Sequence, residues 1–336
     1  MRGCCPMRGV ERESELGRID RIRRLAGATR GCGVVLGIGD DCAIFRQRGA
    51  TDDLVFTSDM LVEDVHFRRA THRPEDIGWK ALARGLSDIA AMGAAPRFCL
   101  VSLALAPWAD SAWVDGFYRG LLRLARREKT VLAGGDLGRA AKVMCDIMVC
   151  GSVPRGRALR RGGAHAGDAI YVSGALGGSA LGLSQLEPAQ LGITKGAGKA
   201  RRRHLKPEPR IALGGFLREK VRATAAMDLS DGLSLDLHRL CLESGLSAAI
   251  VAPPVFPGAS LEQALHGGED YELLFTAGAR TRVPGSFEGL PLTRIGTMRK
   301  GRPGAVFLKG AMFPEGAVFS EGAPLPPLGY DHFRKP

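Results

Sequence analysis

The sequence predicts an α/β (α+β) protein with two domains and mixed sheets. Its 336 residues are more than one domain usually needs. Strand-like and helix-like segments alternate loosely along the chain, and a stretch rich in glycine and arginine at 154–163 separates two such sets. We therefore expect a disordered N-terminus at 1–13, an N-terminal domain at 14–153 and a C-terminal α/β domain at 154–336.

In the N-terminal half, apolar spacing and breaker residues define the expected elements. Apolar residues at helical spacing predict a helix at 14–26 that stops at Gly27. Pro74 opens a second helix, which ends just before Gly93. A third helix is expected at 109–129. Short apolar runs predict strands at 34–38, 42–45, 54–58, 98–106, 130–133 and 143–153.

The C-terminal half begins with an expected strand at 169–173 and a helix at 178–186. A basic segment dotted with glycine, 191–206, has no apolar stripe and is expected to be a loop. The tail at 323–336 is rich in proline and is expected to be irregular. The other expected elements are helices at 208–220 and 231–244 and strands at 224–227, 248–251, 271–276 and 292–297.

Composition excludes several classes of protein. No apolar run reaches the ~18 residues of a membrane span. No apolar segment follows Arg2 and Arg8, as it would in a secretory signal. The eight cysteines include no C-x-x-C pair, so neither a zinc site nor a disulfide framework is indicated. We expect a cytoplasmic protein with no membrane partner.

The net charge of +12 leaves two interpretations open. A basic patch can bind nucleic acid, whereas a basic surface also suits an enzyme with anionic substrates. The basic stretches at 18–30, 155–161 and 195–206 do not interleave aromatic residues as a base-stacking platform would. The sequence therefore favours anionic small molecules, and we expect no nucleic-acid partner.

Carboxylates recur at predicted strand ends and turns, often beside glycine. Oxygen ligands without a histidine or cysteine set suit hard cations such as Mg²⁺. No P-loop, dinucleotide fingerprint or protein-kinase motif competes for a nucleotide. Repetition of one pattern at six places indicates a phosphate site with several metals. The six places are 39–41, 57–59, 87–88, 134–136, 228–232 and 267–270.

Each of these stretches also has a purely structural interpretation. Residues 39–41 alone are typical of a turn. Asp88 follows Arg84 by one helical turn, as in a surface ion pair. Residues 135–136 could form a strand-to-loop corner, and residues 230–231 could be no more than a helix N-cap.

At these places the chain resembles the thiamine-monophosphate kinases, in the superfamily of aminoimidazole ribonucleotide synthetase and selenophosphate synthetase. The resemblance runs in order from about residue 14 to 333, and its last three motifs are specific to the kinases. The motifs are GIGDDCAIF (37–45), TSDMLVEDVHF (57–67), GWKALARGLSDIAAMGAAPR (78–97), AGGDL (133–137), GRALRRGGAHAGDAIYVSGALG (156–177), MDLSDGLSLDL (227–237), GGEDYELLFT (267–276) and GYDHF (329–333).

The resemblance implies transfer of a phosphate from ATP to thiamine monophosphate, the last step in making thiamine diphosphate. It implies several Mg²⁺ ions and a homodimer whose N-terminal domains pair to form the nucleotide cleft. Implied metal ligands are Asp41, Thr57, Ser58, Asp59, Asp88, Asp136, Asp228 and Asp231, of which Asp59, Asp88, Asp41 and Asp228 would carry the chemistry. Implied ATP contacts are Tyr118, Gly135, Asp136, Arg161 and Ser230, and implied substrate contacts are His66, Glu269 and Tyr330.

Three positions depart from the family pattern: Asp64, Gly85 and Leu137 replace the usual residues. Loss of the amide at Gly85 and the hydroxyl at Leu137 alters hydrogen bonding around the ligands. The resemblance assigns no role to the loop at 191–206 or to residues 1–13.

A phosphate monoester has a second pKa of about 6, so the acceptor is already mostly a dianion and needs no side-chain base. We therefore expect direct in-line transfer, with His66 positioning the substrate phosphate rather than acting as a base. Tyr330 has an alternative interpretation, in which its side chain only anchors the C-terminus to the domain. Two rival functions stay open: another ATP-using enzyme of the superfamily, and a basic nucleic-acid-binding protein.

Overall fold

The computed structural model describes residues 14–27, 31–186, 197–310 and 322–333. The expectation for 1–13 lies outside the described residues, as do Cys4 and Cys5. Two mixed sheets organise the described chain, one formed by residues 34–154 and the other by residues 169–324. The predicted α/β class with mixed sheets is confirmed.

The first sheet has six strands among the described residues, in the order β1-β2-β3-β6-β4-β5. All neighbours are antiparallel except β4 and β5, which are parallel. The long β3–β6 pairing runs from Asp52 opposite Pro154 to Val62 opposite Met144. The strands are β1 (Val34–Leu36), β2 (Ala43–Phe45), β3 (Asp52–Val62), β4 (Ala95–Leu105), β5 (Val131–Arg139) and β6 (Met144–Pro154).

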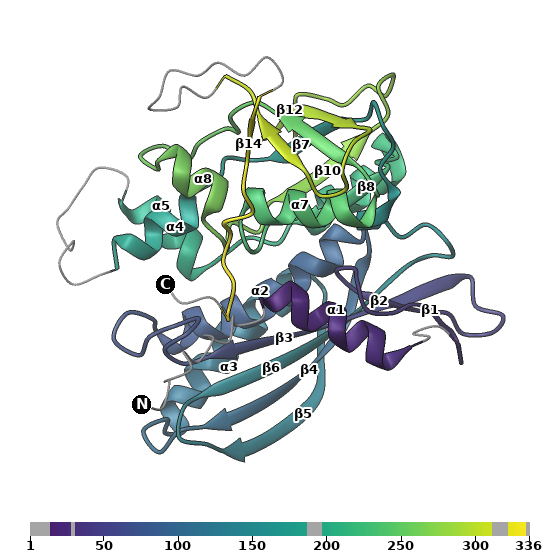
Figure 1. The fold of residues 1–336 in the computed structure, drawn as a ribbon. Coiled ribbons are helices and arrows are strands. Elements are labelled where there is room, and N and C mark those ends of the chain that lie inside the picture. The colour runs from purple at the N-terminus through teal and green to yellow at the C-terminus, as the bar shows by residue number, and fades with distance from the viewer. Residues whose placement is uncertain (1–13, 28–30, 187–196, 311–321, 334–336) are drawn as a thin grey trace, which may run out of the picture.

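Helices α2 (Pro74–Ala91) and α3 (Ser111–Arg127) cover one face of this sheet, and the other face is left open by the described chain (Figure 1). The apolar stripe of α3 buries Phe117, Leu121 and Leu124. Helix α1 (Glu15–Ala26) begins at the N-cap Ser14 and ends at Gly27, as the sequence predicts. Ion pairs of Arg23 with Glu243 and of Glu15 with Arg239 connect it to the second half of the chain.

The second sheet has eight strands among the described residues, in the order β14-β13-β9-β12-β7-β10-β8, with β11 paired to β12. Its strands are β7 (Ala169–Ser173), β8 (Ala225–Asp228), β9 (Ser247–Ile250), β10 (Leu273–Ala277), β11 (Ser286–Phe287), β12 (Leu290–Arg299), β13 (Val306–Leu308) and β14 (Ala323–Pro324). The accompanying α-helices are α4 (Gly178–Ser184), α5 (Ala197–Leu205), α6 (Ile211–Phe216), α7 (Leu233–Glu243) and α8 (Leu261–His266).

Several predicted boundaries are wrong. The strand expected at 54–58 extends to Val62, and the strand expected at 130–133 extends to Arg139. The segment 191–206, expected as a loop, contains helix α5. Helix α5 forms because it packs closely on α4: a Cβ on Gly182 would lie 2.2 Å from the carbonyl oxygen of Ala200. The helix expected at 208–220 is α6 followed by a π-helical turn at Leu217–Val221.

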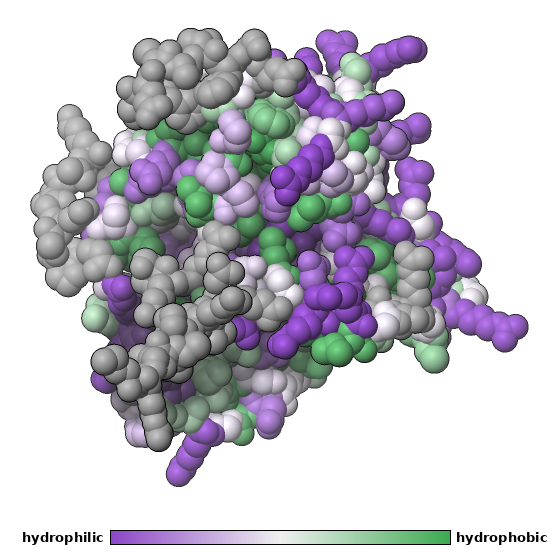
Figure 2. Space-filling view, viewed as in Figure 1, coloured by the Kyte–Doolittle hydropathy of each residue, from purple (hydrophilic) through white to green (hydrophobic). Residues whose placement is uncertain are grey.

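A third apolar cluster joins the two halves of the chain. Ala90 and Ala91, near the end of α2, pack in this cluster with Leu213, Leu217 and Phe275 from the second half. Polar and apolar side chains are interspersed on the face that Figure 2 shows, as on most folded proteins. No helix in the described ranges is long and apolar enough to cross a membrane.

Candidate active site

A cleft of about 1010 Å³ lies where the two halves meet. Its walls come from β3 and the loop after it, α2, the loops flanking β8 and β10, α4, α5, α1 and the C-terminal tail. Eight of the residues predicted for the site line it: Asp59, His66, Asp88, Asp228, Ser230, Asp231, Glu269 and Tyr330.

Three carboxylates from distant parts of the sequence converge at one end of the cleft. One carboxylate oxygen from each of Asp41, Asp88 and Asp228 lies within 4.8 Å of the others. Thr57 donates a hydrogen bond to Asp88. Ser87 donates one of 2.7 Å to Asp228. The surface ion pair between Arg84 and Asp88 that the spacing allowed does not form, since Arg84 pairs instead with Asp59, at 3.4 Å.

The electrostatics of this cluster fit a bound cation. Burial raises the pKa of Asp88 well above its usual value, and the charges of Asp59, Asp228 and Asp41 raise it further. Burial and the charge of Asp41 likewise raise the pKa of Asp228. The Oδ2 atom of Asp41 is enclosed and has no hydrogen-bond partner among the residues that the structure describes. Clustered carboxylates with an unpartnered oxygen suit Mg²⁺, which prefers oxygen ligands and offsets their repulsion.

Arg161 and Asp231 are held by ion pairs. The guanidinium of Arg161 lies 2.5 Å from Oδ1 of Asp41, so the arginine expected to contact ATP binds the acidic turn in this structure. Asp231 pairs with Arg239. The N-cap of α7 is Gly232, so the alternative in which Ser230 and Asp231 serve as a cap is wrong.

His66 is placed to donate a hydrogen bond rather than to accept a proton. The backbone N–H of Val62 donates to its Nδ1 at 3.0 Å, so the proton of the neutral ring lies on Nε2. Burial and the nearby Arg84 lower the pKa of His66 to about 3, so the ring is neutral near pH 7. Its Nε2 is enclosed and has no hydrogen-bond partner in the described part of the chain. The positioning role of His66 stays a prediction, for which Nε2 is the atom that could donate.

Glu269 lies on a strained backbone in the wall of the cleft. Its φ is +63°, a left-handed value that is uncommon outside glycine. Its backbone N–H is fixed to the carbonyl of Ser230 at 2.7 Å. Such strain persists where the surrounding structure over-determines it, often at ligand sites.

Tyr330 closes the cleft from the C-terminal tail. Its backbone N–H bonds the carbonyl of Asp231 at 2.9 Å, and its side chain stays 46 % exposed. The ring meets His332 edge-on at 4.8 Å, and His332 lies 5.1 Å from the His66 ring. Since the backbone anchors the tail, the exposed part of the ring is available to a ligand.

Other predicted residues do not join the cleft. Side chains alternate along a strand, so Ser58 points away from the face that carries Thr57 and Asp59. Ser58 donates to Asp146 at 2.8 Å. Asp146 opposes Ser102 across β6–β4, and Ser102 opposes Asp136 across β4–β5. Ser58 and Asp136 therefore share the open face of the first sheet.

The remaining ATP candidates are also outside the cleft. Tyr118 on α3 is half-buried and packs edge-on against Phe117 at 5.3 Å. Gly135 lies inside β5 rather than at a strand-to-loop corner. A Cβ there would lie 1.9 Å from the carbonyl oxygen of Val101, which gives this glycine a packing reason as well.

Lys80 is a cleft-associated residue that the sequence reasoning missed. It is fully buried on α2, and its ammonium lies 2.9 Å from Oε2 of Glu269. Lys80, Arg84, Ser87 and Asp88 are spaced four, three and one apart, which places them on one face of the helix. A polar stripe on an otherwise apolar helix was the signal available in the sequence.

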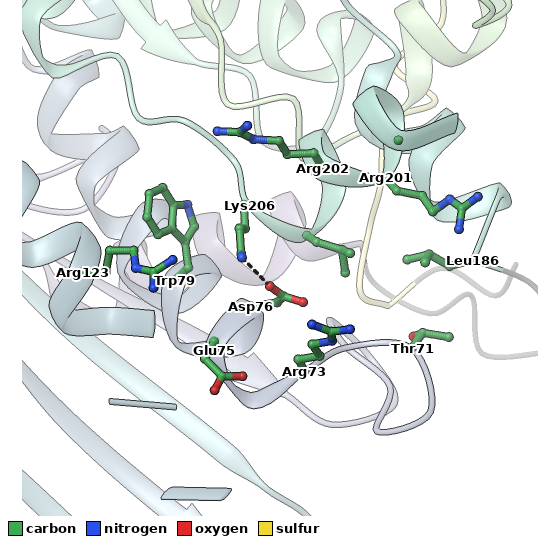
Figure 3. Close-up of a pocket in the computed structure, with 12 residues that line it drawn as sticks. Thr71, Arg73, Glu75, Asp76, Trp79, Arg123, Leu186, Arg201, Arg202 and Lys206 are labelled. Atoms are coloured by element: carbon green, nitrogen blue, oxygen red, sulfur yellow. Dashed lines mark ion pairs between the residues drawn. The ribbon is translucent and has the colours of Figure 1, made fainter. Parts of the chain in front are cut away.

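A second cavity, of about 920 Å³, shares Thr71 and Leu186 with the cleft. Figure 3 shows Lys206, the residue after α5, reaching toward Asp76 of α2; their ion pair is 2.9 Å long. This ion pair joins the two halves of the chain outside the cleft.

The comparisons with known proteins agree with this geometry. Residues 39–153 match the family model described as AIR synthase related protein, N-terminal domain. The thiamine-monophosphate kinase of Escherichia coli (strain K12) is 39 % identical over 318 residues, 90 % of this chain and 93 % of that protein. The solved structure of AaThiL complexed with AMPPCP and TMP matches with a TM-score of 0.80 at 31 % identity, covering 95 % of this chain and 97 % of that one. Hydrogenase maturation protein HypE in complex with ATP shares the fold alone, with a TM-score of 0.62 at 19 % identity over 88 % and 91 % of the chains.

Residues 39–153, which form most of the first sheet, match the class of AIR synthase-related N-terminal domains, and the carboxylate-lined cleft lies where this part meets the second half of the chain. The sequence identity to the kinases, and the share of each chain that is covered, identify the family within that class. The chain belongs to the thiamine-monophosphate kinase family.

Proposed function

We propose that this protein transfers the γ-phosphate of ATP to thiamine monophosphate and forms thiamine diphosphate. The observation that carries the proposal is the convergence of Asp41, Asp88 and Asp228 within 4.8 Å, beside a cleft also lined by His66 and Glu269. A cation-binding end next to a polar, partly aromatic cleft suits a substrate with a phosphate at one end and charged rings at the other.

The residues that would hold Mg²⁺ are Asp41, Asp88 and Asp228, with Asp59 lining the same part of the cleft. Bound there, the ions neutralise phosphate charge and align the donor and acceptor. Thr57 and Ser87 orient two of the carboxylates through their hydroxyl groups. Asp231 also lines the cleft and is proposed to hold a further ion. When no ion is bound there, Arg239 offsets the charge of the Asp231 carboxylate.

The chain's own groups then position the acceptor. The Nε2–H of His66 donates to the substrate phosphate, because Nδ1 is occupied by the Val62 N–H. No side chain needs to remove a proton, since the phosphate monoester is already ionised near pH 7. Glu269 and Tyr330 meet the thiamine rings. Transfer is direct and in line, with no phosphorylated side chain.

Gly135 and Asp136, with Ser58, complete the nucleotide site only if a second copy covers the open face of the first sheet, whereas Tyr118 belongs to α3 on the covered face. Met60 and Leu100 are 52 % and 37 % exposed on the open face, an apolar surface that pairing would bury. We therefore propose a homodimer through this sheet. Light scattering should give twice the chain mass, and Met60→Asp should give the monomer.

Two rival functions predict different results. Another superfamily activity would turn over an aminoimidazole precursor rather than thiamine monophosphate. A nucleic-acid-binding protein would show a gel shift that weakens with salt. A cytoplasmic location is expected for the kinase.

The deciding experiment is an ADP-release assay with ATP and Mg²⁺, comparing thiamine monophosphate, free thiamine and aminoimidazole precursors. ADP release with thiamine monophosphate alone, with thiamine diphosphate as product, supports the proposal. Turnover of another acceptor, or of none, contradicts it.

A further inference from the structure

We propose that Lys80 is a positioning residue for the thiamine end of the substrate: it holds Glu269 with one carboxylate oxygen facing the cleft. The inference rests on the proposed function and deepens it, since it assigns a role to a buried group that the mechanism above does not use.

The first support is the geometry of the Glu269 carboxylate. Lys80 Nζ contacts its Oε2 at 2.9 Å, and Nδ1 of His204 contacts the same oxygen at 3.2 Å. Oε1 has no hydrogen-bond partner among the described residues, and the side chain lines the cleft. One oxygen is therefore anchored, and the other is left for a cation or an N–H donor of the ligand.

The second support is that Lys80 fixes both proposed substrate contacts at once. Its ammonium also donates to the backbone carbonyl of His66 at 3.2 Å. His66 follows β3 in the first half, whereas Glu269 precedes β10 in the second. A single buried cation thus sets the distance between the group that meets the phosphate and the group that meets the rings.

The third support is the charge state of Glu269. Burial by itself raises the pKa of a carboxyl group, but nearby cations, Lys80 above all, bring the pKa of Glu269 down to about 2. The carboxylate therefore stays ionised at every working pH. Thiamine carries a cationic thiazolium and an exocyclic amine, and either suits the free Oε1.

If the Lys80–Glu269 ion pair only stabilised the fold, its loss would have a different effect from the loss of a pair that positions a substrate-binding group. Lys206 and Asp76 supply the matched control, because their ion pair is also 2.9 Å long and also joins the second half of the chain to α2 (Figure 3). It lies in the second cavity and does not line the cleft. Lys206→Met should leave the KM for thiamine monophosphate within about twofold of the wild-type value.

The experiment measures kcat and both KM values for the wild type, Lys80→Met, Glu269→Gln and the double variant, with melting temperature as the check on folding. Lys80→Met should raise KM for thiamine monophosphate by at least about tenfold, since a misplaced binding group costs that much. KM for ATP should change less than about threefold. The double variant should resemble Glu269→Gln alone, because the two residues act as one unit.

The pH dependence supplies a readout that a structural role would not move. Without Lys80, the pKa of Glu269 rises, so KM for thiamine monophosphate in Lys80→Met should increase as the pH falls from 8 to 6. The wild type and the double variant should show only the smaller dependence that comes from the substrate phosphate, whose second pKa is about 6. The other titratable or charged groups around Glu269 stay in place in all variants: Arg84, His66, His204, Asp231, Tyr271 and Tyr330.

If Lys80→Met does not fold, His204→Phe removes the other anchor of Oε2, and it should raise KM for thiamine monophosphate about three- to tenfold with KM for ATP unchanged. Additive effects in the double variant, or equal rises in both KM values, would overturn the role of Lys80. Failure of the wild type to turn over thiamine monophosphate would instead overturn the proposed function.

Discussion

The hydroxyl of Ser87 donates a hydrogen bond of 2.7 Å to Oδ2 of Asp228, and both side chains are buried. Ser87 belongs to α2 and Asp228 ends β8, so this bond joins the two halves of the chain at the carboxylate cluster. It lowers the pKa of an Asp228 carboxyl that burial raises. The bond therefore favours the ionised form that a metal needs.

Ser87→Ala should weaken metal binding more than it weakens folding. Loss of an orienting hydrogen bond to a ligand typically costs about 10- to 100-fold in metal affinity. The Mg²⁺ concentration for half-maximal activity should rise by about tenfold or more, while the free energy of unfolding falls by about 1–3 kcal/mol. Ser184→Ala is the control, since that hydroxyl bonds the carbonyl of Leu181 within α4. An unchanged Mg²⁺ requirement in Ser87→Ala would separate Ser87 from the metal site.

Asp88→Asn and Asp59→Asn should each abolish turnover while the protein stays folded. An amide cannot supply the charge that binds the metal. We expect kcat to fall by about a hundredfold or more. Without metal, Asp88→Asn should melt no lower than the wild type, because removing one carboxylate relieves repulsion from Asp59, Asp228 and Asp41. A variant with near-normal kcat would remove that residue from the metal site.

The sequence predicts the site residues only as well as it predicts the lengths of the strands that carry them. The sequence correctly assigns Asp59 and Asp88 to one site. The proline that starts α2 and the order of the motifs are both clear in the sequence. It does not separate Ser58 from Asp59, since that requires knowing that β3 continues to Val62. In a continuous strand, adjacent side chains lie on opposite faces, whereas in a turn they can converge.

Helix α5 shows a second limit of sequence reasoning. Its residues form no apolar stripe, so local pattern predicts a loop. The helix is instead stabilised by packing of Ala200 against Gly182 and by burial of His204. Lys80 was not predicted for a similar reason: its role depends on a tertiary contact, and its partner Glu269 is 189 residues away in the chain.

The stability of the metal-free protein should fall as the pH rises from about 6.5 to 7.5 and then level off. Burial, followed by the charge of Asp41, raises the pKa of Asp40 from 3.8 to about 7. A carboxyl group whose pKa is higher in the folded state contributes stability below its unfolded pKa and loses it as pH rises through the folded value. The buried histidines act oppositely, but only below about pH 6.5: the pKa of His66 and of His204 falls to about 3 and that of His72 to about 4.

The measurement is the melting temperature across this pH range in EDTA and in Mg²⁺. We expect a decrease of a few degrees in EDTA, about what a loss of 1–2 kcal/mol gives for a chain of this size. Mg²⁺ should oppose the decrease, because it binds the ionised carboxylates. Asp88→Asn should flatten the EDTA profile. A melting temperature that does not respond to pH or to Mg²⁺ would contradict a carboxylate metal site.

Tyr330→Ala should raise KM for thiamine monophosphate and leave KM for ATP nearly unchanged. The tail is held by its backbone, through the bond from Tyr330 N–H to the carbonyl of Asp231, so loss of the ring should not release it. The ring is 46 % exposed in the cleft wall and can stack on the thiazolium or the aminopyrimidine. A cation–π contact contributes about 0.5–2 kcal/mol, which corresponds to a rise in KM of about 3- to 30-fold. Tyr330→Phe keeps the aromatic face and should stay within about twofold of the wild type. If Tyr330→Ala instead raises both KM values together, or lowers the melting temperature sharply, the ring is an anchor for the C-terminus and does not recognise the substrate.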